Sequence, residues 1–315
     1  MKTVSATTGI GHIRIHSVLY ANEPSRIAQT IHHLNRAADL AIAAGVLTSV
    51  TLVYGDSSPE PILSEQWLSE IKNSCYALRD VQHIDFQANL GSARGHNTLI
   101  EHVNASEETN GETVSAVLIM NPDVMLAPNA LIELARPLAN KRVGLVEARQ
   151  LPIEHPKEYD RLTGDTEWAT TACALIPMAV LRELNGFDSD TFFLYCDDVD
   201  FSWRARLAGY RIVYQPSAAV FHDKRLAPGG NWAPTISEQY FSAEAAMLIA
   251  HKYSRPDIAD RLYESYRKSD SEHLRRAAAE FSRRKECKLL PNPLDPTHSV
   301  AVFKGDYYTK HRFQL

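Results

Sequence analysis

The sequence predicts an α/β protein with a mostly parallel central sheet flanked by helices, followed by a C-terminal helical extension. Strand-like apolar runs alternate with helical periodicity from Ile13 to Glu147, and polar turns follow the early runs, which is typical of a parallel sheet. Beyond His222, two long helical patterns follow one another. We therefore expect residues 1–232 to form the α/β domain and residues 233–315 the extension.

The composition narrows the class of protein. The chain has 315 residues with 44% hydrophobic and 23% charged residues, ordinary values for a globular protein. A formal net charge of −5 argues against nucleic acid as a partner. The four cysteines are scattered without metal-ligand or redox spacing, which favours a reducing compartment. Neither a signal peptide nor an apolar run of about 18 residues is present, so we expect a cytoplasmic protein.

The first two predicted strands end in polar turns that should lie on one rim of the sheet. Ile13–Leu19 leads into a helix that begins near Pro24, and Val50–Val53 leads into a second turn. Ligands bind beyond the carboxyl ends of parallel strands. The candidate ligand-binding residues on this rim are Ala21, Asn22 and Asp56. For Asp56 the alternative is an Asx turn that closes a loop.

A third strand, His83–Phe86, precedes a segment with two glycines and two asparagines, Asn89–Asn97. This spacing is typical of a turn into a helix where backbone approaches a ligand closely, although the G-x-G-x-x-G spacing of dinucleotide sites is absent. The fork of Arg94 suits phosphate oxygens. The alternative for Arg94 is an exposed helical side chain.

The central strand of the predicted sheet is the apolar run Val114–Met120, which we expect to be buried on both faces. It ends at Asn121-Pro122-Asp123. A carboxylate and an amide at this position are the oxygen ligands that Mg²⁺ and Mn²⁺ prefer. The alternative is a simple polar turn.

The later elements are predicted from the same patterns. We expect the following elements in chain order: a helix over Pro128–Leu138, a strand over Val143–Glu147, a loop over Leu151–Asp165, a strand over Tyr210–Tyr214 that Pro216 ends, a short strand at Val220-Phe221, helices from Ser237 and over Leu274–Cys287, and a strand in Val300–Leu315. The basic and aromatic run Lys224–Trp232 is either a lid over phosphates or a linker.

Three carboxylates, Asp197, Asp198 and Asp200, fall in the first turn of a predicted helix that ends at Gly209. The simpler interpretation is a capped helix whose dipole favours acidic residues. However, three carboxylates in four positions repel one another, and the aromatic residues before them raise the cost of their charge. The alternative is therefore a functional carboxylate cluster.

The ordered residues of this region resemble the signature of family 2 glycosyltransferases. They are Gly186-Phe187-Asp188, Phe192-Phe193-Leu194-Tyr195, Asp197-Asp198-Val199-Asp200, Arg204, Gly209-Tyr210, Pro216 and His222. Asn121-Pro122-Asp123 is similar to the Asp-x-Asp of this family, in the variant of rhamnosyltransferase-like members. The departures from the family pattern are Asp197 for Glu, Asn121 for Asp, Gly55-Asp56 for Asp-Asn and the missing Gly after Trp168.

The resemblance covers Ile13–His222 and implies the GT-A nucleotide-sugar fold. It implies an inverting glycosyltransferase that moves a sugar from a nucleotide-diphosphate donor, dTDP-rhamnose or a UDP-sugar. The implied acceptor is a hydroxyl of a bacterial cell-surface glycan or a lipid-linked glycan.

The resemblance also implies the roles of individual residues. Asp198 would be the catalytic base, assisted by Asp197 and Asp200, while Asp123 and His222 would hold Mn²⁺ or Mg²⁺. The implied donor-binding residues are Ala21, Asn22, Asp56, Asn89, Gly91, Arg94, Asn97 and Asn121. The implied acceptor-binding residues are Trp168 and Tyr195.

Three alternatives remain open at this point. A nucleotidyltransferase would need a basic glycine-rich loop near the N-terminus, and Tyr20–Ser25 contains neither Lys nor Gly. A non-catalytic glycan-binding or scaffold protein is compatible with the departures from the family pattern. The basic residues of Leu274–Cys287 either form a solvated helix face or contact the inner face of the cell membrane.

Overall fold

The computed structural model describes residues 9–110, 113–223 and 235–309. Their strands are β1 (Gly11–Leu19), β2 (Leu47–Asp56), β3 (Asp80–Asp85), β4 (Ala116–Met120), β5 (Val124–Leu126), β6 (Val143–Leu151), β7 (Cys173–Pro177) and β8 (Arg211–His222). They form one sheet in the order β3-β2-β1-β4-β7-β6-β8-β5. The pairs β3–β2, β2–β1, β1–β4 and β6–β8 are parallel, while β7 and β5 run antiparallel to their neighbours. The predicted mostly parallel sheet is confirmed.

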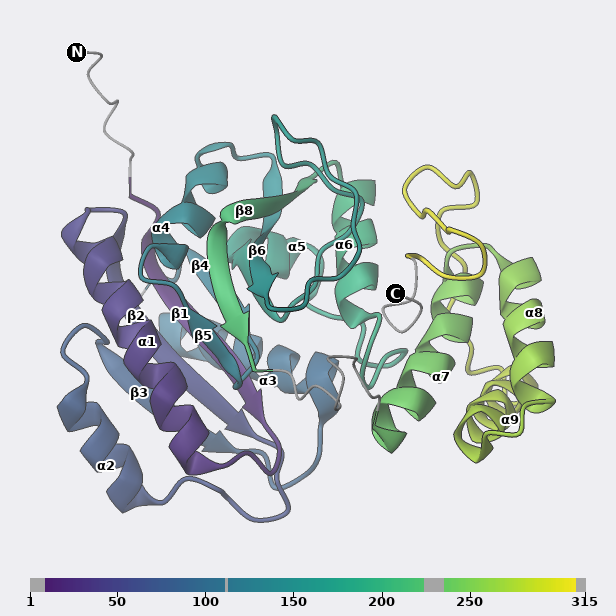
Figure 1. The fold of residues 1–315 in the computed structure, drawn as a ribbon, viewed down its shortest axis with the longest axis horizontal. Helices are drawn as coiled ribbons and strands as arrows, with labels where there is room; N and C mark the ends of the chain where they lie inside the picture. The colour runs from purple at the N-terminus through teal and green to yellow at the C-terminus, as the bar shows by residue number, and fades with distance from the viewer. Residues whose placement is uncertain (1–8, 111–112, 224–234, 310–315) are drawn as a thin grey trace.

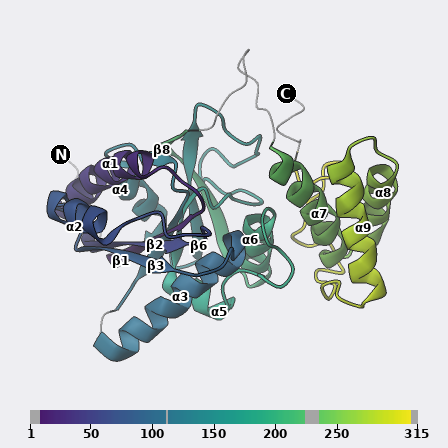
Figure 2. The same cartoon turned by 90° about the horizontal axis from the view of Figure 1, so that it is seen from below.

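Helices cover both faces of this sheet. They are α1 (Pro24–Ala43), α2 (Glu65–Ser74), α3 (Gly91–Asn110), α4 (Ala130–Ala135), the 3₁₀ turn η1 (Arg136–Ala139), α5 (Met178–Glu183), α6 (Asp197–Leu207), α7 (Ile236–Lys252), α8 (Pro256–Arg267) and α9 (Glu272–Glu286). α1, α2 and α4 lie on one face, α3, α5 and α6 lie on the other, and α7–α9 stand at one end (Figures 1 and 2).

The sequence pattern explains why these elements form. All five residues of β4 are buried because helices cover the sheet on both sides. α1 begins with Pro24, which is pre-organised for the first turn, and buries Ile27, Ile31 and Leu34 at helical spacing. Both elements were predicted from these residues.

α6 belongs to two hydrophobic cores. Phe201 and Ala205 pack with the sheet and α5, whereas Val199 and Trp203 pack with the helices of the extension. Trp203 contacts Tyr253 edge-on, with 4.7 Å between the ring centroids. The helix that carries the acidic cluster is therefore held between the sheet and the extension. The division at residue 232 stays a prediction.

Several predicted boundaries were wrong. Pro216 does not end a strand, because β8 continues through it with a shift of register against β6, where a bulge absorbs the missing N–H. The helix predicted over Pro128–Leu138 is α only to Ala135 and then tightens to a 3₁₀ turn that contains Pro137. Helix α8 was not predicted.

The C-terminal strand predicted over Val300–Leu315 is also wrong for the described residues, where only an isolated bridge joins Lys304 to Tyr307. The run Lys224–Trp232 lies outside the described residues.

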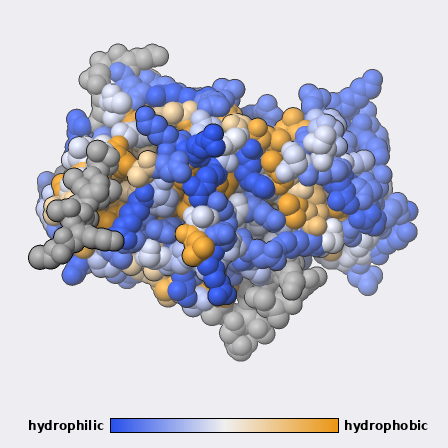
Figure 3. Space-filling view, turned by 90° about the horizontal axis from the view of Figure 1, so that it is seen from above, coloured by the Kyte–Doolittle hydropathy of each residue, from blue (hydrophilic) through white to orange (hydrophobic). Residues whose placement is uncertain are grey.

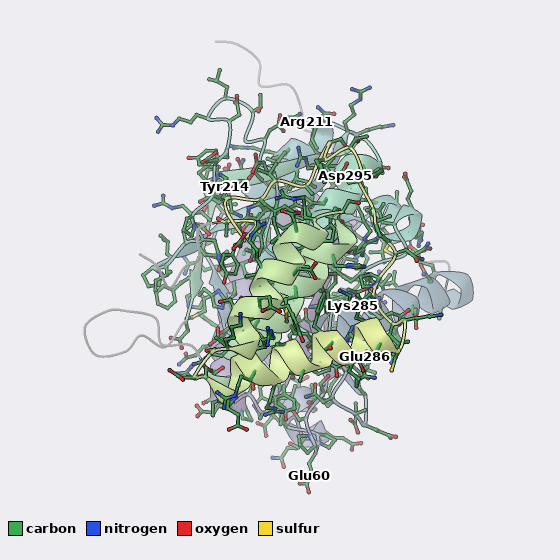
Figure 4. The ribbon with its side chains drawn as sticks, turned by 90° about the vertical axis from the view of Figure 1, so that its right-hand side faces the viewer. Glu60, Arg211, Tyr214, Lys285, Glu286 and Asp295 are labelled. Atoms are coloured by element: carbon green, nitrogen blue, oxygen red, sulfur yellow. The ribbon has the colours of Figure 1, made fainter. Side chains whose placement is uncertain are left out.

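The basic residues of α9 have acidic neighbours. Arg283 pairs with Glu280 and Lys285 with Asp260, and Figure 4 shows Lys285 and Glu286 at the C-terminal end of this helix. Such pairs reduce the positive charge that an anionic membrane would attract. Among the described helices, none combines the length and apolarity that a bilayer crossing demands. A peripheral membrane contact stays a prediction.

Candidate active site

A cavity of about 700 Å³ lies where α6 and the edge of the sheet face the helical extension. The sheet and α6 contribute Asn121, Asp198 and His222, and the extension contributes Leu274 and Tyr307. Figure 3 shows apolar surface gathered in the region where the helices α7–α9 adjoin the sheet. The cavity therefore has a polar wall that includes five of the predicted site residues, Asn121, Tyr195, Asp197, Asp198 and His222, and a partly apolar wall from the C-terminal region.

Asp197 and Asp198 reach the cavity from the start of α6. Cys196, the residue before the helix, has a left-handed φ of 57° and turns the chain sharply into the first helical turn. The Asp197 carboxylate is buried and accepts a hydrogen bond of 2.7 Å from the Ser92 hydroxyl. Asp198 is partly exposed, and its Oδ1 accepts from the Val199 N–H at 2.8 Å. The two predicted carboxylates thus line one wall together.

The electrostatics of this pair suit proton transfer. Loss of solvent around the carboxyl, followed by the charge of Asp197, raises the pKa of Asp198 to about 7. Burial also raises the pKa of Asp197, although the Ser92 hydroxyl opposes that change. A general base works best when its pKa lies near the operating pH. Asp198 therefore has the protonation behaviour of a base at neutral pH.

Asp200 does not reach the cavity. Its carboxylate is fully buried and pairs with Arg204 at 2.7 Å and with Lys252 Nζ at 2.5 Å. The Tyr253 hydroxyl donates to the same carboxylate at 3.0 Å. These contacts join α6 to α7, so Asp200 can hold Asp198 in place only through the helix.

Asp123 and His222 meet because β5 pairs with β8. Val124 lies opposite His222 in this antiparallel pair, and Asp123 comes directly before Val124. As a result His222 Nε2 lies 3.2 Å from Asp123 Oδ1. Asn121 lies at the end of β4, where its N–H donates to the Ala172 carbonyl, and it also lines the cavity.

The pair of Asp123 and His222 fits a divalent cation. Neighbouring ligands of an octahedral ion, each at about 2.1 Å, lie roughly 3 Å apart, close to the separation of these two atoms. Imidazole and carboxylate together suit Mn²⁺, and carboxylate suits Mg²⁺. Within the described residues no group of three or more His, Cys, Asp or Glu side chains converges, so further ligands would come from an amide such as Asn121, from phosphates or from water.

The predicted rim residues are largely occupied by contacts within the protein. Asp56 is fully buried and accepts from the N–H groups of Ser58 and Ile62 and from His83, which is the Asx-type turn given as its alternative. The Ala21 N–H donates to the Ser58 hydroxyl, and Asn22 caps the N–H of Tyr20. These residues shape the turns after β1 and β2.

Gly55, one of the departures from the family pattern, has a packing reason. A Cβ at this position would lie 2.2 Å from the ring of Phe86. Any larger residue would have to displace that ring.

The Asn89–Asn97 segment forms the predicted turn into α3. Asn89 accepts from the Gly91 N–H at 3.1 Å, and Gly91 has a φ of +67° with the Phe193 carbonyl 2.4 Å from where a Cβ would be. Asn97 bonds both polar atoms of its amide to the backbone of Phe187. The segment therefore packs against the loop that precedes α6.

The Arg94 side chain is exposed, as its alternative interpretation predicted, and its Nη2 lies 3.4 Å from Asp190 Oδ1. The structure does not bring it to the cavity lining. Its role toward a phosphate stays a prediction.

The two predicted acceptor residues differ in position. Tyr195 lines the cavity next to the acidic cluster. Trp168 is buried, with Lys157 Nζ 4.4 Å from the ring centroid and Tyr308 edge-on at 4.9 Å. Trp168 therefore supports the wall from behind, whereas Tyr195 faces the space that a ligand would occupy.

Several polar residues of the cavity were not predicted. Ser92 contacts Asp197 across 105 residues of sequence, and Gln150 contacts His222 across 72 residues. Thr170 joins Gln150 from a loop. Ser92 lies inside the segment Asn89–Asn97, which the sequence already indicated as close to the ligand. Gln150 and Thr170 belong to no recognisable motif, so nothing in the sequence indicated their place in the site.

The chain is similar in sequence to rhamnosyltransferases, although no family model matches it. It is 26% identical to the N-acetylglucosaminyl-diphospho-decaprenol L-rhamnosyltransferase of Mycobacterium tuberculosis over 205 residues, 52% of this chain and 66% of the relative. It is 23% identical to rhamnosyltransferase WbbL of Escherichia coli over 158 residues, 41% of this chain and 60% of the relative. The matches thus span less than two thirds of each relative.

Solved structures with the same fold are glycosyltransferases. GalNAc-T7 with UDP, GalNAc and Mn²⁺ superposes with a TM-score of 0.61 at 13% identity, covering 89% of this chain and 55% of that one. The mannosyltransferase PcManGT of Pyrobaculum calidifontis with GDP-Man and Mn²⁺ gives 0.55 at 17% identity, covering 93% and 81%. The predicted GT-A fold is confirmed, and the resemblance to rhamnosyltransferase-like family 2 enzymes is supported by the sequence relatives.

Proposed function

We propose that this chain, rhamnosyltransferase-like in sequence and GT-A in fold, is an inverting glycosyltransferase. Its donor is a nucleotide-diphosphate sugar, dTDP-rhamnose or a UDP-sugar, and its acceptor is a hydroxyl of a lipid-linked or cell-surface glycan. The observation that carries the proposal is one cavity lined by Asp198, with a pKa near neutrality, and by His222, which lies beside Asp123.

The proposed reaction is a single displacement. Asp198 takes the proton of the acceptor hydroxyl while that oxygen forms a bond to the anomeric carbon. The bond from this carbon to the diphosphate oxygen breaks, and the nucleotide diphosphate leaves with the electron pair. Because the attack comes from the face opposite the leaving group, the anomeric configuration inverts. Asp197, held by Ser92, lies beside Asp198, and its negative charge when ionised favours a protonated product state of the base.

The chain's own ligands for a divalent ion are Asp123 and His222, and Asn121 lines the same cavity as His222. Mn²⁺ or Mg²⁺ bound there would supply positive charge to the diphosphate leaving group. The Mn²⁺ in both structural neighbours supports this assignment. The residues bind and orient the diphosphate end of the donor and place the sugar toward Asp198.

The acceptor enters from the side of the extension. Tyr307, Leu274 and Ala243 form a partly apolar wall, and Glu238 adds a carboxylate from the first turn of α7. Aromatic and aliphatic side chains that alternate with a few polar groups are typical of small-molecule sites. The names of the sequence relatives support a lipid-linked acceptor.

Calorimetry with dTDP and UDP, with and without Mn²⁺, tests the donor site. We expect binding of at least one nucleotide that strengthens with Mn²⁺, because a shared cation bridges protein and phosphate. Asp123→Ala should remove the gain from Mn²⁺ and leave metal-free binding unchanged. Equal Mn²⁺-dependent affinity in wild type and Asp123→Ala would contradict the metal assignment.

A second measurement separates an enzyme from a binding protein. The assay offers dTDP-rhamnose, or a panel of UDP-sugars, together with an N-acetylglucosaminyl-diphospho-lipid as acceptor. Transfer is measured as the amount of nucleotide diphosphate released. Nucleotide binding without any transfer or donor hydrolysis would favour a non-catalytic role. Absence of nucleotide binding up to millimolar concentration, with Mn²⁺ present, would overturn the proposal.

A further inference from the structure

A buried chain of polar side chains leads away from the candidate metal site. His222 Nδ1 lies 2.8 Å from Gln150 Oε1, and Gln150 Nε2 donates to the Thr170 hydroxyl at 2.8 Å. The Thr170 hydroxyl donates to Glu147 Oε1 at 2.8 Å, and Lys157 pairs with Glu147 Oε2. Strand β6 supplies Glu147 and Gln150, β8 ends in His222, and the loop between β6 and β7 supplies Lys157 and Thr170.

All members of this polar chain are shielded from water. Glu147 and Gln150 are fully buried, Thr170 is 4% exposed, and the Lys157 side chain is 2% exposed. Leaving a buried polar group without a hydrogen-bond partner destabilises the folded protein. Each member therefore depends on its neighbours rather than on solvent, and the arrangement has little freedom.

The ion pair at the far end fixes the direction of every hydrogen bond. Burial raises the pKa of Glu147, but the Lys157 ammonium on Oε2 and the Thr170 hydroxyl on Oε1 oppose that change and favour the carboxylate, which only accepts. The Thr170 hydroxyl must then give its single proton to Glu147, so its oxygen accepts from the Gln150 amide group. The Gln150 oxygen is left facing His222, and it can only accept.

His222 consequently carries its proton on Nδ1. In a neutral imidazole the other nitrogen then holds the lone pair, and Nε2 is the atom that faces Asp123 at 3.2 Å. Only a nitrogen with a free lone pair binds a cation. The hydrogen-bond chain thus prepares His222 as a ligand before any donor arrives.

We infer that Gln150 and Thr170 are positioning residues that set the tautomer and orientation of His222 for the divalent ion. Glu147 and Lys157 anchor them. The inference rests on the proposed function, because it assumes that a metal-bound nucleotide occupies the cavity. Loss of a residue that hydrogen-bonds to a metal ligand typically changes metal affinity by roughly 10- to 100-fold.

The Thr170 hydroxyl is the best point to interrupt the chain. Thr170→Val keeps the shape but has no acceptor for Gln150, so the Gln150 amide can turn and present its N–H₂ group to His222. Nδ1 would then accept, and Nε2 would carry the proton. The variant leaves the Glu147–Lys157 ion pair in place, whereas removing either ion would strand a buried charge and risk unfolding.

Two control variants isolate the effect. Thr170→Ser keeps the hydroxyl and should behave as wild type within about threefold. Thr166→Val removes another buried hydroxyl of the same loop, one that donates to the Glu158 carbonyl at 2.8 Å outside the polar chain. Because the hydrogen bonds of the Thr166 hydroxyl go to the Glu158 and Trp168 carbonyls and not to Gln150 or Glu147, this variant reports the general cost of losing a buried hydroxyl.

The experiment is calorimetric titration of dTDP or UDP into each variant with Mn²⁺ and with EDTA. We expect Thr170→Val to weaken Mn²⁺-dependent affinity at least about tenfold while the affinity in EDTA stays within about twofold. Thr166→Val should lower the melting temperature without changing either affinity. Affinity of Thr170→Val within twofold of wild type in Mn²⁺, or equal losses in both Val variants, would overturn the inference. Wild type that binds nucleotide equally well in Mn²⁺ and in EDTA would overturn the metal assignment and this inference with it. Wild type that binds no nucleotide would instead refute the proposed function.

Discussion

Replacing Asp198 by Asn tests the assignment of the catalytic base. The change keeps the size of the side chain and its hydrogen bond from the Val199 N–H, but an amide does not accept a proton at neutral pH. General bases contribute about 10² to 10⁴ in rate. We therefore expect turnover to fall by at least about 100-fold, while nucleotide affinity stays close to wild type because the base acts on the acceptor.

The pKa of Asp198 also predicts how strongly turnover depends on pH. With a pKa of about 7, the carboxylate is about nine-tenths ionised at pH 8 and about one-tenth ionised at pH 6. The base works only when ionised, so wild-type turnover at saturating donor should fall roughly tenfold between pH 8 and pH 6. Asp198→Asn should lack this fall.

The assay is release of nucleotide diphosphate in the presence of a lipid-linked acceptor, with nucleotide affinity measured in parallel. Asp190→Asn serves as the control, because its side chain is 92% exposed and lies in the same part of the sequence. Near wild-type turnover of Asp198→Asn, or loss of turnover only through loss of donor binding, would refute the reasoning. So would a turnover that stays constant from pH 8 to pH 6.

Two further predictions concern stability. Burial lowers the pKa of His96 to about 4 from an ordinary 6.5, so as the pH falls below 6.5 the unfolded state gains a proton that the folded state does not. Between pH 8 and pH 5, wild type should lose about 2 kcal/mol more of its unfolding free energy than His96→Met in urea denaturation, and parallel pH dependences would contradict this. Lys252→Met removes the cation that pairs with the carboxylates of Asp188 and Asp200, although Arg204 still pairs with Asp200. In the same assay the free energy of unfolding should therefore fall by about 3 kcal/mol. A loss below about 1 kcal/mol would show that the ion pairs of Lys252 do not stabilise the folded protein.

The fold was predictable where the period of apolar residues matched a single type of element. β1, β4 and α1 were predicted because their buried residues follow a continuous run or a helical spacing. β8 was broken at Pro216 in the prediction because a proline usually ends a strand, and only the pairing with β6 shows the bulge that tolerates it. α8 begins at Pro256 close behind α7, and this proline is the same start signal as Pro24 in α1, which the prediction missed.

The site was predictable where chemistry is concentrated in a short segment. Asp197 and Asp198 are neighbouring carboxylates that repel each other, and this unfavourable repulsion predicted a functional role. Both line the cavity. Asp123 and His222 were brought together only by the family resemblance, since the β5–β8 pairing joins residues far apart in sequence. The Asp56 carboxylate accepts from Ser58, Ile62 and His83, so the turn given as its alternative is present, and its role toward the donor stays a prediction.

The helical extension is part of the candidate site and not only its neighbour. Asp197 and Asp198 lie at the start of α6. The extension buries Val199 and Trp203 of this helix, and Lys252 forms an ion pair with its Asp200. Without these contacts α6 would expose its second apolar face and lose a buried cation, so the orientation of Asp198 depends on α7. The same helices supply one wall of the cavity. A difference in the extension between related chains can therefore change the acceptor space and the position of the base together.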